Sequence, residues 1–258
     1  MKLIDLSVSL EDQLPVDPPP QITRIRYIDH KQSIPDMLRL FPGVAENALP
    51  EGYGWAVEDV SLNTHSGTHM DAPWHYHPTM NHGQRAWTID EVPLEWCMGN
   101  GVVLDLSDKP DGYVCSSADL QEALDRINYK LSPGDIVLIH TSAPSRWGRP
   151  EYLSAGCGVG REGTLWLCSQ GIHLMGTDAW SWDAPLSTIA KHYAQTKDPA
   201  LIWEGHKAGA ERAYCHMEKL TNLDKLPSHG FTFVGFPIKI CKAGGGWVRA
   251  VAMVDEER

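Results

Sequence analysis

Three imidazoles and one carboxylate fall within eleven consecutive residues of this chain. The stretch is His65-Ser-Gly-Thr-His69-Met-Asp71-Ala-Pro-Trp-His75, so its spacing is H-x3-H-x-D-x3-H. Imidazole nitrogen and carboxylate oxygen together suit zinc, manganese or ferrous iron. Gly67 and Pro73 argue against a regular helix and favour a tight turn that lets His65, His69 and Asp71 converge. The stretch therefore predicts a metal site, and the alternative is a surface tract of histidines without a ligand.

The elements that position this stretch follow from the hydrophobic periodicity. Alternation over Val57–His65 predicts a half-buried strand that ends at the first histidine. Capping and breaker residues predict a helix that starts near Ser116 and another over 161–170 that is ended by Gly171. Further strands are predicted over 101–106, 136–140, 172–175 and 247–254. Helices and strands mix irregularly, so we expect one α/β domain over residues 1–258 with a mixed sheet.

One segment stands apart from this pattern. Residues 29–58 combine scattered proline and glycine with apolar side chains such as Met37, Phe41 and Trp55. Connections of this length are commonly lids or interface arms. We expect this insertion to be an arm between subunits of a homodimer or homotetramer.

Composition excludes several classes of protein. The 258 residues carry 33 acidic and 22 basic side chains, a net charge of −11, which argues against nucleic-acid and anionic-membrane partners. No apolar run approaches the ~20 residues that span a bilayer, and Asp5 comes too early for a signal peptide. The six cysteines form no C-x-x-C pair, so we expect reduced thiols and a cytoplasmic protein.

The metal-site stretch resembles a known family. Its pattern H-x-G-T-H-x-D-x-P-x-H is similar to the signature of the cyclase and kynurenine formamidase family, metal-dependent hydrolases that include bacterial arylformamidases and isatin hydrolases. The resemblance extends over most of the chain, through Ile4–Ser7, Pro133–Ile139, Gly176–Asp178, Asn222–Pro227 and Pro237–Ile240. It implies a barrel-like mixed sheet flanked by helices, of the swivelling β/β/α type.

The resemblance also implies a fuller ligand set. The family takes further ligands from a histidine and a glutamate twelve residues apart, and His206 and Glu218 have that spacing. With His65, His69 and Asp71 they would hold one or two divalent ions, Zn or Mn, and Asp71 and Glu218 would bridge two. His216 is a rival ligand, because a strand would place it on the same face as Glu218.

The chemistry expected of such a site is hydrolysis. A divalent ion brings the pKa of its water from 15.7 to about 7, and the resulting hydroxide attacks a carbonyl carbon that the metal polarises. His75 is the expected acid/base catalyst. The favoured reaction is opening of a cyclic amide, a lactam or imide of the isatin type. An arylformamidase or a lactone hydrolase would use the same chemistry, and a non-catalytic metal- or ligand-binding homologue is the alternative from another class.

Aromatic residues near the motif indicate the substrate. The chain has 10 tryptophans, and we expect Trp74, Trp180 and Trp55 to contact a small aromatic or cyclic molecule. Asp178 supports a ligand histidine or caps a strand-end turn. The run Gly244–Gly246 has no following helix or Lys-Ser/Thr pair, so a hairpin turn is favoured over a phosphate-binding loop.

Overall fold

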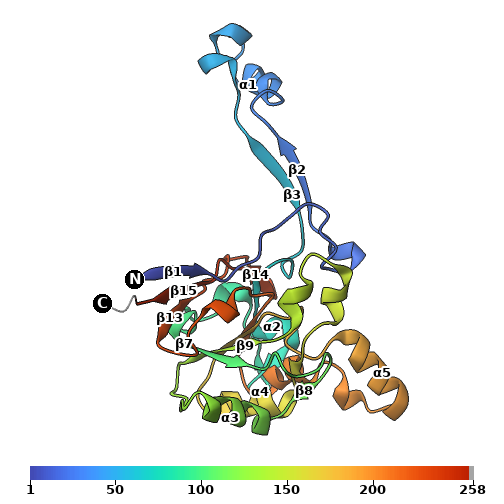
Figure 1. Cartoon of the computed structure of the whole chain (residues 1–258). Helices are drawn as coiled ribbons and strands as arrows, with labels where there is room; N and C mark the ends of the chain where they lie inside the picture. The colour runs from blue at the N-terminus through green and yellow to red at the C-terminus, as the bar shows by residue number, and fades with distance from the viewer. Residues whose placement is uncertain (256–258) are drawn as a thin grey trace.

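A nine-stranded mixed sheet organises the computed structural model, which describes residues 1–255 (Figure 1). In spatial order the strands are β1 (Lys2–Asp5), β15 (Val251–Val254), β13 (Phe231–Val234), β7 (Met98–Asp105), β9 (Ile136–His140), β11 (Leu174–Thr177), β12 (Cys215–Glu218), β4 (His69–Asp71) and β14 (Gly245–Trp247). Strands β7, β9, β11 and β12 are mutually parallel, and the remaining pairs are antiparallel. The sheet curls into a half-barrel flanked by helices, which confirms the predicted fold class.

Within the described residues, six α-helices and three two-stranded ribbons complete the fold. The helices are α1 (Ile34–Leu40), α2 (Pro73–Tyr76), α3 (Ser117–Arg126), α4 (Arg161–Ser169), α5 (Leu186–Thr196) and α6 (Glu204–Lys207). The ribbons pair β2 (Arg24–Ile28) with β3 (Val57–Ser61), β5 (Thr79–Met80) with β6 (Gln84–Arg85), and β8 (Val114–Cys115) with β10 (Gly158–Val159). Single turns of 3-10 helix lie at Pro19–Gln21, Glu46–Ala48, Pro50–Gly52, Ile89–Glu91, Leu94–Trp96, Ala143–Arg146, Pro150–Ser154, Pro199–Leu201, Ala208–Ala210 and Leu223–Lys225.

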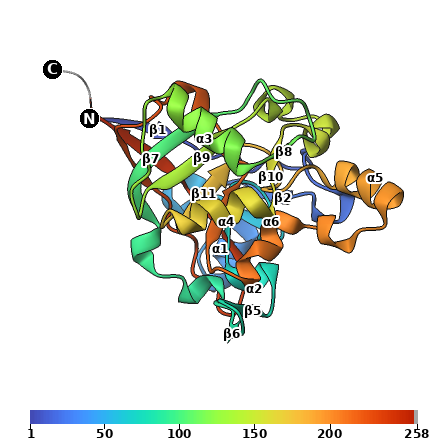
Figure 2. The ribbon, with the colours of Figure 1, turned by 90° about the horizontal axis from the view of Figure 1, so that it is seen from below.

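Both faces of the sheet are buried. Along β7, Val102 and Leu104 pack on one face with Leu120 of α3 and Leu167 of α4, whereas Val103 packs on the other. Helices α3 and α4 lie across the sheet on the first face (Figure 2). Burial on both faces explains why Ile136–Ile139 of β9 and Val102–Leu104 of β7 are continuous apolar runs with no alternation.

Local signals place the helix ends as expected. Ser116 caps α3: its hydroxyl accepts from the Asp119 amide at 3.3 Å, and the Asp119 carboxylate accepts from the Ser116 amide at 2.9 Å. Helix α4 ends at Ser169, and Gly171 takes a left-handed φ of +83° that a side chain would disfavour. Both predicted helices are confirmed.

The ribbon β2–β3 forms an arm that projects from the body and carries α1 near its tip (Figure 1). Every residue of β3 is exposed, including Val60 at 49%. The prediction of a half-buried strand over Val57–His65 was therefore wrong: the strand ends at Ser61 and neither face packs on the sheet. Alternation indicates an extended strand, but it does not show which surface, if any, covers the apolar side.

Other features bear on the class of protein. No helix within residues 1–255 combines the length and the apolar character that crossing a bilayer requires. All six cysteine thiols are free, and four of them are buried.

Candidate metal centre

The register between β4 and β12 brings four chemical groups to one place. In this antiparallel pair Asp71 lies opposite His216, and His69 lies opposite Glu218. Residues two apart on a strand project from the same face, so each strand contributes two side chains to that face. All four residues are buried, and β14 covers the other edge of β4.

Three more histidines reach the cluster from outside these strands. His206 lies in α6 and is buried, His65 lies in the turn that follows the arm, and His75 lies in α2. The side chains of His65 and His75 remain 24% and 25% exposed. The cluster therefore has a closed inner part and a mouth that reaches solvent.

The distances in the inner part are compatible with ligands of one metal ion. Asp71 Oδ2 lies 3.7 Å from His206 Nε2 and 3.3 Å from His216 Nε2. Glu218 Oε1 lies 3.5 Å and 3.2 Å from the same two nitrogens. Bonds of about 2.1 Å in tetrahedral geometry separate ligand atoms by about 3.4 Å, so these four atoms fit one ion.

The other oxygens of the same carboxylates face the motif histidines. Asp71 Oδ1 lies 2.7 Å from His65 Nδ1 and 3.3 Å from His69 Nε2, and Glu218 Oε2 lies 3.6 Å from His69 Nε2. His75 Nε2 lies 3.6 Å from Asp71 Oδ2. The two carboxylates thus stand between two groups of imidazoles.

Two atoms of this cluster have no hydrogen-bond partner. Within the described residues, His69 Nε2 and Asp71 Oδ2 are the buried side-chain polar atoms left unsatisfied. Leaving such a group unpaired costs about 1–3 kcal/mol, and more when it is charged. Both are metal-ligand atoms by type, so the residues present fit a bound divalent cation.

Hydrogen bonds orient the ligand atoms toward one another. His69 donates its Nδ1–H to the Gly67 carbonyl at 2.9 Å, which directs Nε2 into the cluster. His206 donates its Nδ1–H to Asp183 at 2.5 Å, and the Trp182 amide donates to Glu218 Oε1 at 2.8 Å. Such partners fix the tautomer and the ring orientation of a metal ligand.

Burial and neighbouring charges set the protonation states. Burial raises the pKa of the Asp71 carboxyl, but the imidazoles of His75, His65 and His69 outweigh it and hold that pKa well below its usual range. Burial lowers the pKa of His206, yet the hydrogen bond to Asp183 raises it to about 10. Burial lowers the pKa of His75 to about 4. These pKa shifts favour an ionised Asp71 carboxylate beside a His75 imidazole that is neutral at pH 7.

Glycine permits the close approach of β14 to this cluster. A Cβ on Gly245 would lie 2.8 Å from His65 Cε1 and 3.1 Å from Asp71 Oδ1. Gly245 and Gly246 are part of a strand and not of a hairpin turn, so that prediction was wrong for two of the three glycines. The side chains of this run are absent because the strand passes directly beside the candidate ligands His65 and Asp71.

A buried ion pair supports the mouth of the cluster. The Lys219 ammonium, 1% exposed, donates to Asp17 Oδ1 and to the His65 carbonyl at 2.8 Å. Asp17 also accepts from Trp180 Nε1 at 2.9 Å, and the Lys219 carbonyl accepts from the Thr68 hydroxyl at 2.6 Å. The residue that follows Glu218 thus ties the His65 turn to the proline-rich segment near the N-terminus.

The three tryptophans predicted to contact the substrate lie at different distances from the cluster. Trp74 precedes His75 and is 43% exposed. Trp180 lies beside the Asp17–Lys219 pair, with Lys219 Nζ 5.3 Å from its ring centre. The Trp55 carbonyl accepts from Ser33 at the start of α1, so Trp55 lies on the arm and outside the cluster of this chain.

Asp178 takes the second of its two expected roles. Its carboxylate accepts from the Thr141 amide at 2.9 Å and the Thr141 hydroxyl at 2.7 Å, and lies 2.6 Å from His140 Nδ1. It therefore fixes the end of β9, and its partner histidine is outside the metal cluster.

Sequence reasoning ranked one member of the cluster second and missed others. His216, the rival of His206, lies in the cluster together with His206. The H-x-E spacing of β12 was the signal for it. Asp183 and Trp203 had no comparable signal, because Asp183 bonds to His206 and Trp203 meets His75 across long stretches of sequence.

The curled sheet, the buried His/Asp/Glu cluster and the matches to known proteins together identify the class as a metal-dependent hydrolase. A family model described as "Putative cyclase" matches residues 4–184. The chain belongs to this family, as its motif predicted.

The chain shares low sequence identity with individual known proteins, but the matches extend over most of each chain. The chain is 27% identical to a kynurenine formamidase of Erythrobacter litoralis, over 88% of this chain and 93% of that protein. It is 25% identical to an isatin hydrolase of Roseibium aggregatum, over 85% and 84%. A crystal structure of an isatin hydrolase bound to the product analogue thioisatinate superposes with a TM-score of 0.76, at 20% identity, over 99% of this chain and 93% of that one.

Proposed function

We propose that this chain hydrolyses the C–N bond of a cyclic amide of the isatin type at a centre of two divalent ions. The observation that carries the hydrolytic part is the arrangement of Asp71 and Glu218. One oxygen of each faces His206 and His216, and the other faces His69. The similarity to an isatin hydrolase over 85% of the chain supports the cyclic amide.

In the proposed reaction, His75 is the acid/base catalyst that carries out both proton transfers. Bound divalent ions would supply activated water at neutral pH and polarise the substrate carbonyl. Water adds to the carbonyl carbon, the C–N bond breaks, and the product is an amino carboxylate. His75, half-buried at the mouth with Nε2 3.6 Å from Asp71, takes a proton from the water and returns it to the leaving nitrogen.

The test is turnover by metal-stripped protein reloaded with Zn or Mn and given isatin, an N-formyl arylamine and an aryl lactone. We expect fastest hydrolysis of isatin and loss of at least a hundredfold in His75→Asn, since general acid–base catalysis contributes about 10²–10⁴. His77→Asn is the matched control, because His77 is exposed and bonds to Thr79. Isatin turnover that His75→Asn leaves unchanged would overturn the assignment.

A second candidate is an arylformamidase. The 27% identity to a kynurenine formamidase, over 93% of that protein, favours it. The same panel distinguishes the two, because the formyl substrate would then be preferred over isatin. No turnover of any substrate by protein that holds its metal would instead indicate a non-catalytic homologue.

The number of ions is part of the proposal. Asp71, His206, His216 and Glu218 are one group of candidate ligands, and His65, Asp71 and His75 are another. In the proposed binuclear centre the first group would hold one ion, and the second ion would be held near His65 and His69, which lie 2.7 Å and 3.3 Å from Asp71 Oδ1. We expect two ions per chain by elemental analysis after dialysis, whereas a saturating value of one would refute the binuclear centre.

We also propose that the arm docks on a second copy of the chain. A two-stranded ribbon is marginally stable alone in water, yet this one exposes both faces and the apolar side chains of Leu40, Phe41 and Tyr53 near its tip. A partner subunit would cover them. Sedimentation should give a dimer or tetramer of the 28.7 kDa chain, and a fully active monomer at all concentrations would exclude the role.

A further inference from the structure

Trp203 stands next to the metal cluster in a strained conformation. Its φ of 58° and ψ of 42° are left-handed, a region that bulky side chains avoid. It lies immediately before α6, three residues from the ligand His206. Strain of this kind persists only where the surrounding structure enforces it, and it clusters at functional sites.

Two carboxylates hold the turn that carries Trp203. Asp183 accepts from the amides of Gly205 at 2.7 Å and His206 at 3.0 Å. Glu204 Oε2 accepts from the Arg161 amide at 3.0 Å. A Cβ on Gly205 would lie 2.4 Å from the Val159 carbonyl, so the turn is also packed tightly against β10. These contacts hold the backbone that carries the indole in place.

The indole completes a set of rings around the mouth of the cluster. It stacks on His206 with ring centres 4.2 Å apart and planes at 16°, and it meets His75 edge to face at 5.0 Å and 77°. His75 in turn lies 3.9 Å from His65. His65, His75 and Trp203 are all half-buried, whereas His69, Asp71 and Glu218 beneath them are buried. We call these three half-buried residues the aromatic rim.

We propose that Trp203 is a specificity-determining residue that binds the planar ring of an aryl-fused substrate and so holds its carbonyl over the cluster. The inference rests on the proposed function and adds the residue that selects the substrate class. Trp203 is better placed for this than the predicted Trp74, because its ring contacts both a ligand histidine and the proposed acid/base histidine. Of the three rim rings it is also the largest and the most apolar.

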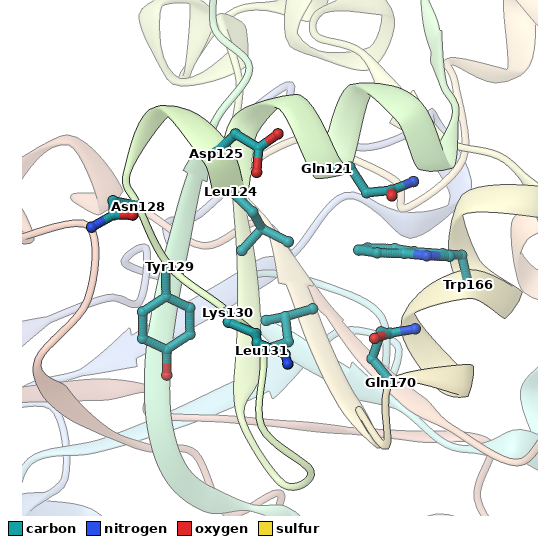
Figure 3. A pocket seen from close by; sticks show the side chains of 9 residues that line it. All are labelled: Gln121, Leu124, Asp125, Asn128, Tyr129, Lys130, Leu131, Trp166 and Gln170. Carbon is teal, nitrogen blue, oxygen red and sulfur yellow. The ribbon is translucent and has the colours of Figure 1, made fainter.

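The experiment measures binding and does not require turnover. Benzoate and cyclohexanecarboxylate carry the same charge and nearly the same bulk, but only benzoate is planar and aromatic. Calorimetric titration of the Zn-loaded protein with each acid gives a ratio of dissociation constants for wild type, Trp203→Ala and Trp203→Phe. Trp166→Ala is the control, since the Trp166 indole points into the groove between α3 and α4 (Figure 3). Elemental analysis of every variant establishes that the metal is retained.

We expect wild type to prefer benzoate and Trp203→Ala to bind it about tenfold more weakly, with the preference lost; tenfold is about 1.4 kcal/mol. Trp203→Phe should keep most of the preference, and Trp166→Ala all of it. An unchanged ratio in Trp203→Ala that retains its metal would overturn the proposal. A third outcome separates the two proposals. If isatin is not hydrolysed, but wild type still prefers benzoate and Trp203→Ala loses that preference, the proposed substrate is refuted and the role of Trp203 stands.

Discussion

Replacing Lys219 with methionine tests whether the ion pair beside the metal cluster supports it. Lys219 and Asp17 are 1% and 5% exposed, and they are separated by more than two hundred residues of chain. Methionine keeps the length and most of the volume of the lysine stem but removes the ammonium. Position 219 has a left-handed φ of 58°, and lysine and methionine are both unbranched at Cβ. The backbone strain is therefore similar in the two proteins and does not confound the comparison.

The expected cost follows from what the substitution leaves behind. Asp17 would remain buried with the Trp180 indole N–H as its partner and without a counter-charge. Breaking a buried ion pair by removing one partner costs about 3–5 kcal/mol. At about 2–4 °C per kcal/mol for a chain of this size, the melting temperature should fall by about 6–20 °C.

A double-mutant cycle separates charge from packing. Asp17→Asn keeps an oxygen for the Trp180 indole, so Asp17→Asn/Lys219→Met removes both charges and retains that hydrogen bond. We expect the double variant to be at least about 2 kcal/mol more stable than Lys219→Met, because no unpaired charge stays buried. Chemical denaturation of chelator-treated protein gives the free energies without a contribution from metal. Lys225→Met, at an exposed lysine that donates to Asn222, is the control and should stay within about 0.5 kcal/mol of wild type.

Two results would refute this reasoning. One is a cost below about 1 kcal/mol for Lys219→Met, which would mean that the Asp17 carboxylate is satisfied without the ammonium. The other is simple additivity of the two single substitutions. A loss in metal affinity that accompanies the loss in stability would further show that the His65 carbonyl contact holds the ligand turn in place.

Three other predictions concern metal and pH. Metal at one hundred times its dissociation constant should stabilise the protein by about 2.7 kcal/mol, and a melting temperature that chelator leaves unchanged would contradict the proposed centre. Asp183→Asn should lower the metal affinity about 10–100-fold in competition titrations, because it weakens the hydrogen bond that orients the His206 ring. A variant with the metal affinity of wild type would refute this orienting role of Asp183. Burial opposes ionisation of the Asp119 carboxyl, yet hydrogen bonds from Lys109 and Ser116 hold its pKa below the ordinary value. The ionised Asp119 carboxylate therefore contributes fully to the free energy of unfolding above pH of about 4, and this contribution is lost as pH falls through the folded-state pKa. The difference in the free energy of unfolding between wild type and Asp119→Asn should shrink on acidification.

The site was predictable to the extent that its residues are close in sequence. A tight turn with the spacing of His65, His69 and Asp71 brings these side chains close together. The H-x-E sequence of β12 places His216 on the same face of the strand as Glu218. The fold class followed from buried apolar runs, and helix ends followed from caps and glycines. These signals are local, because they depend on backbone geometry within one turn or one strand.

Sequence by itself determined the candidate donor residues, their local spacing and the family. Only the tertiary structure decided that Asp71 pairs with His216 and His69 with Glu218, because register depends on which faces the whole sheet buries. It also decided that Asp183 orients His206, that Asp17 meets Lys219, and that the arm leaves β3 unpacked. No periodicity encodes these contacts, since they join segments whose approach is set by the packing of the entire sheet.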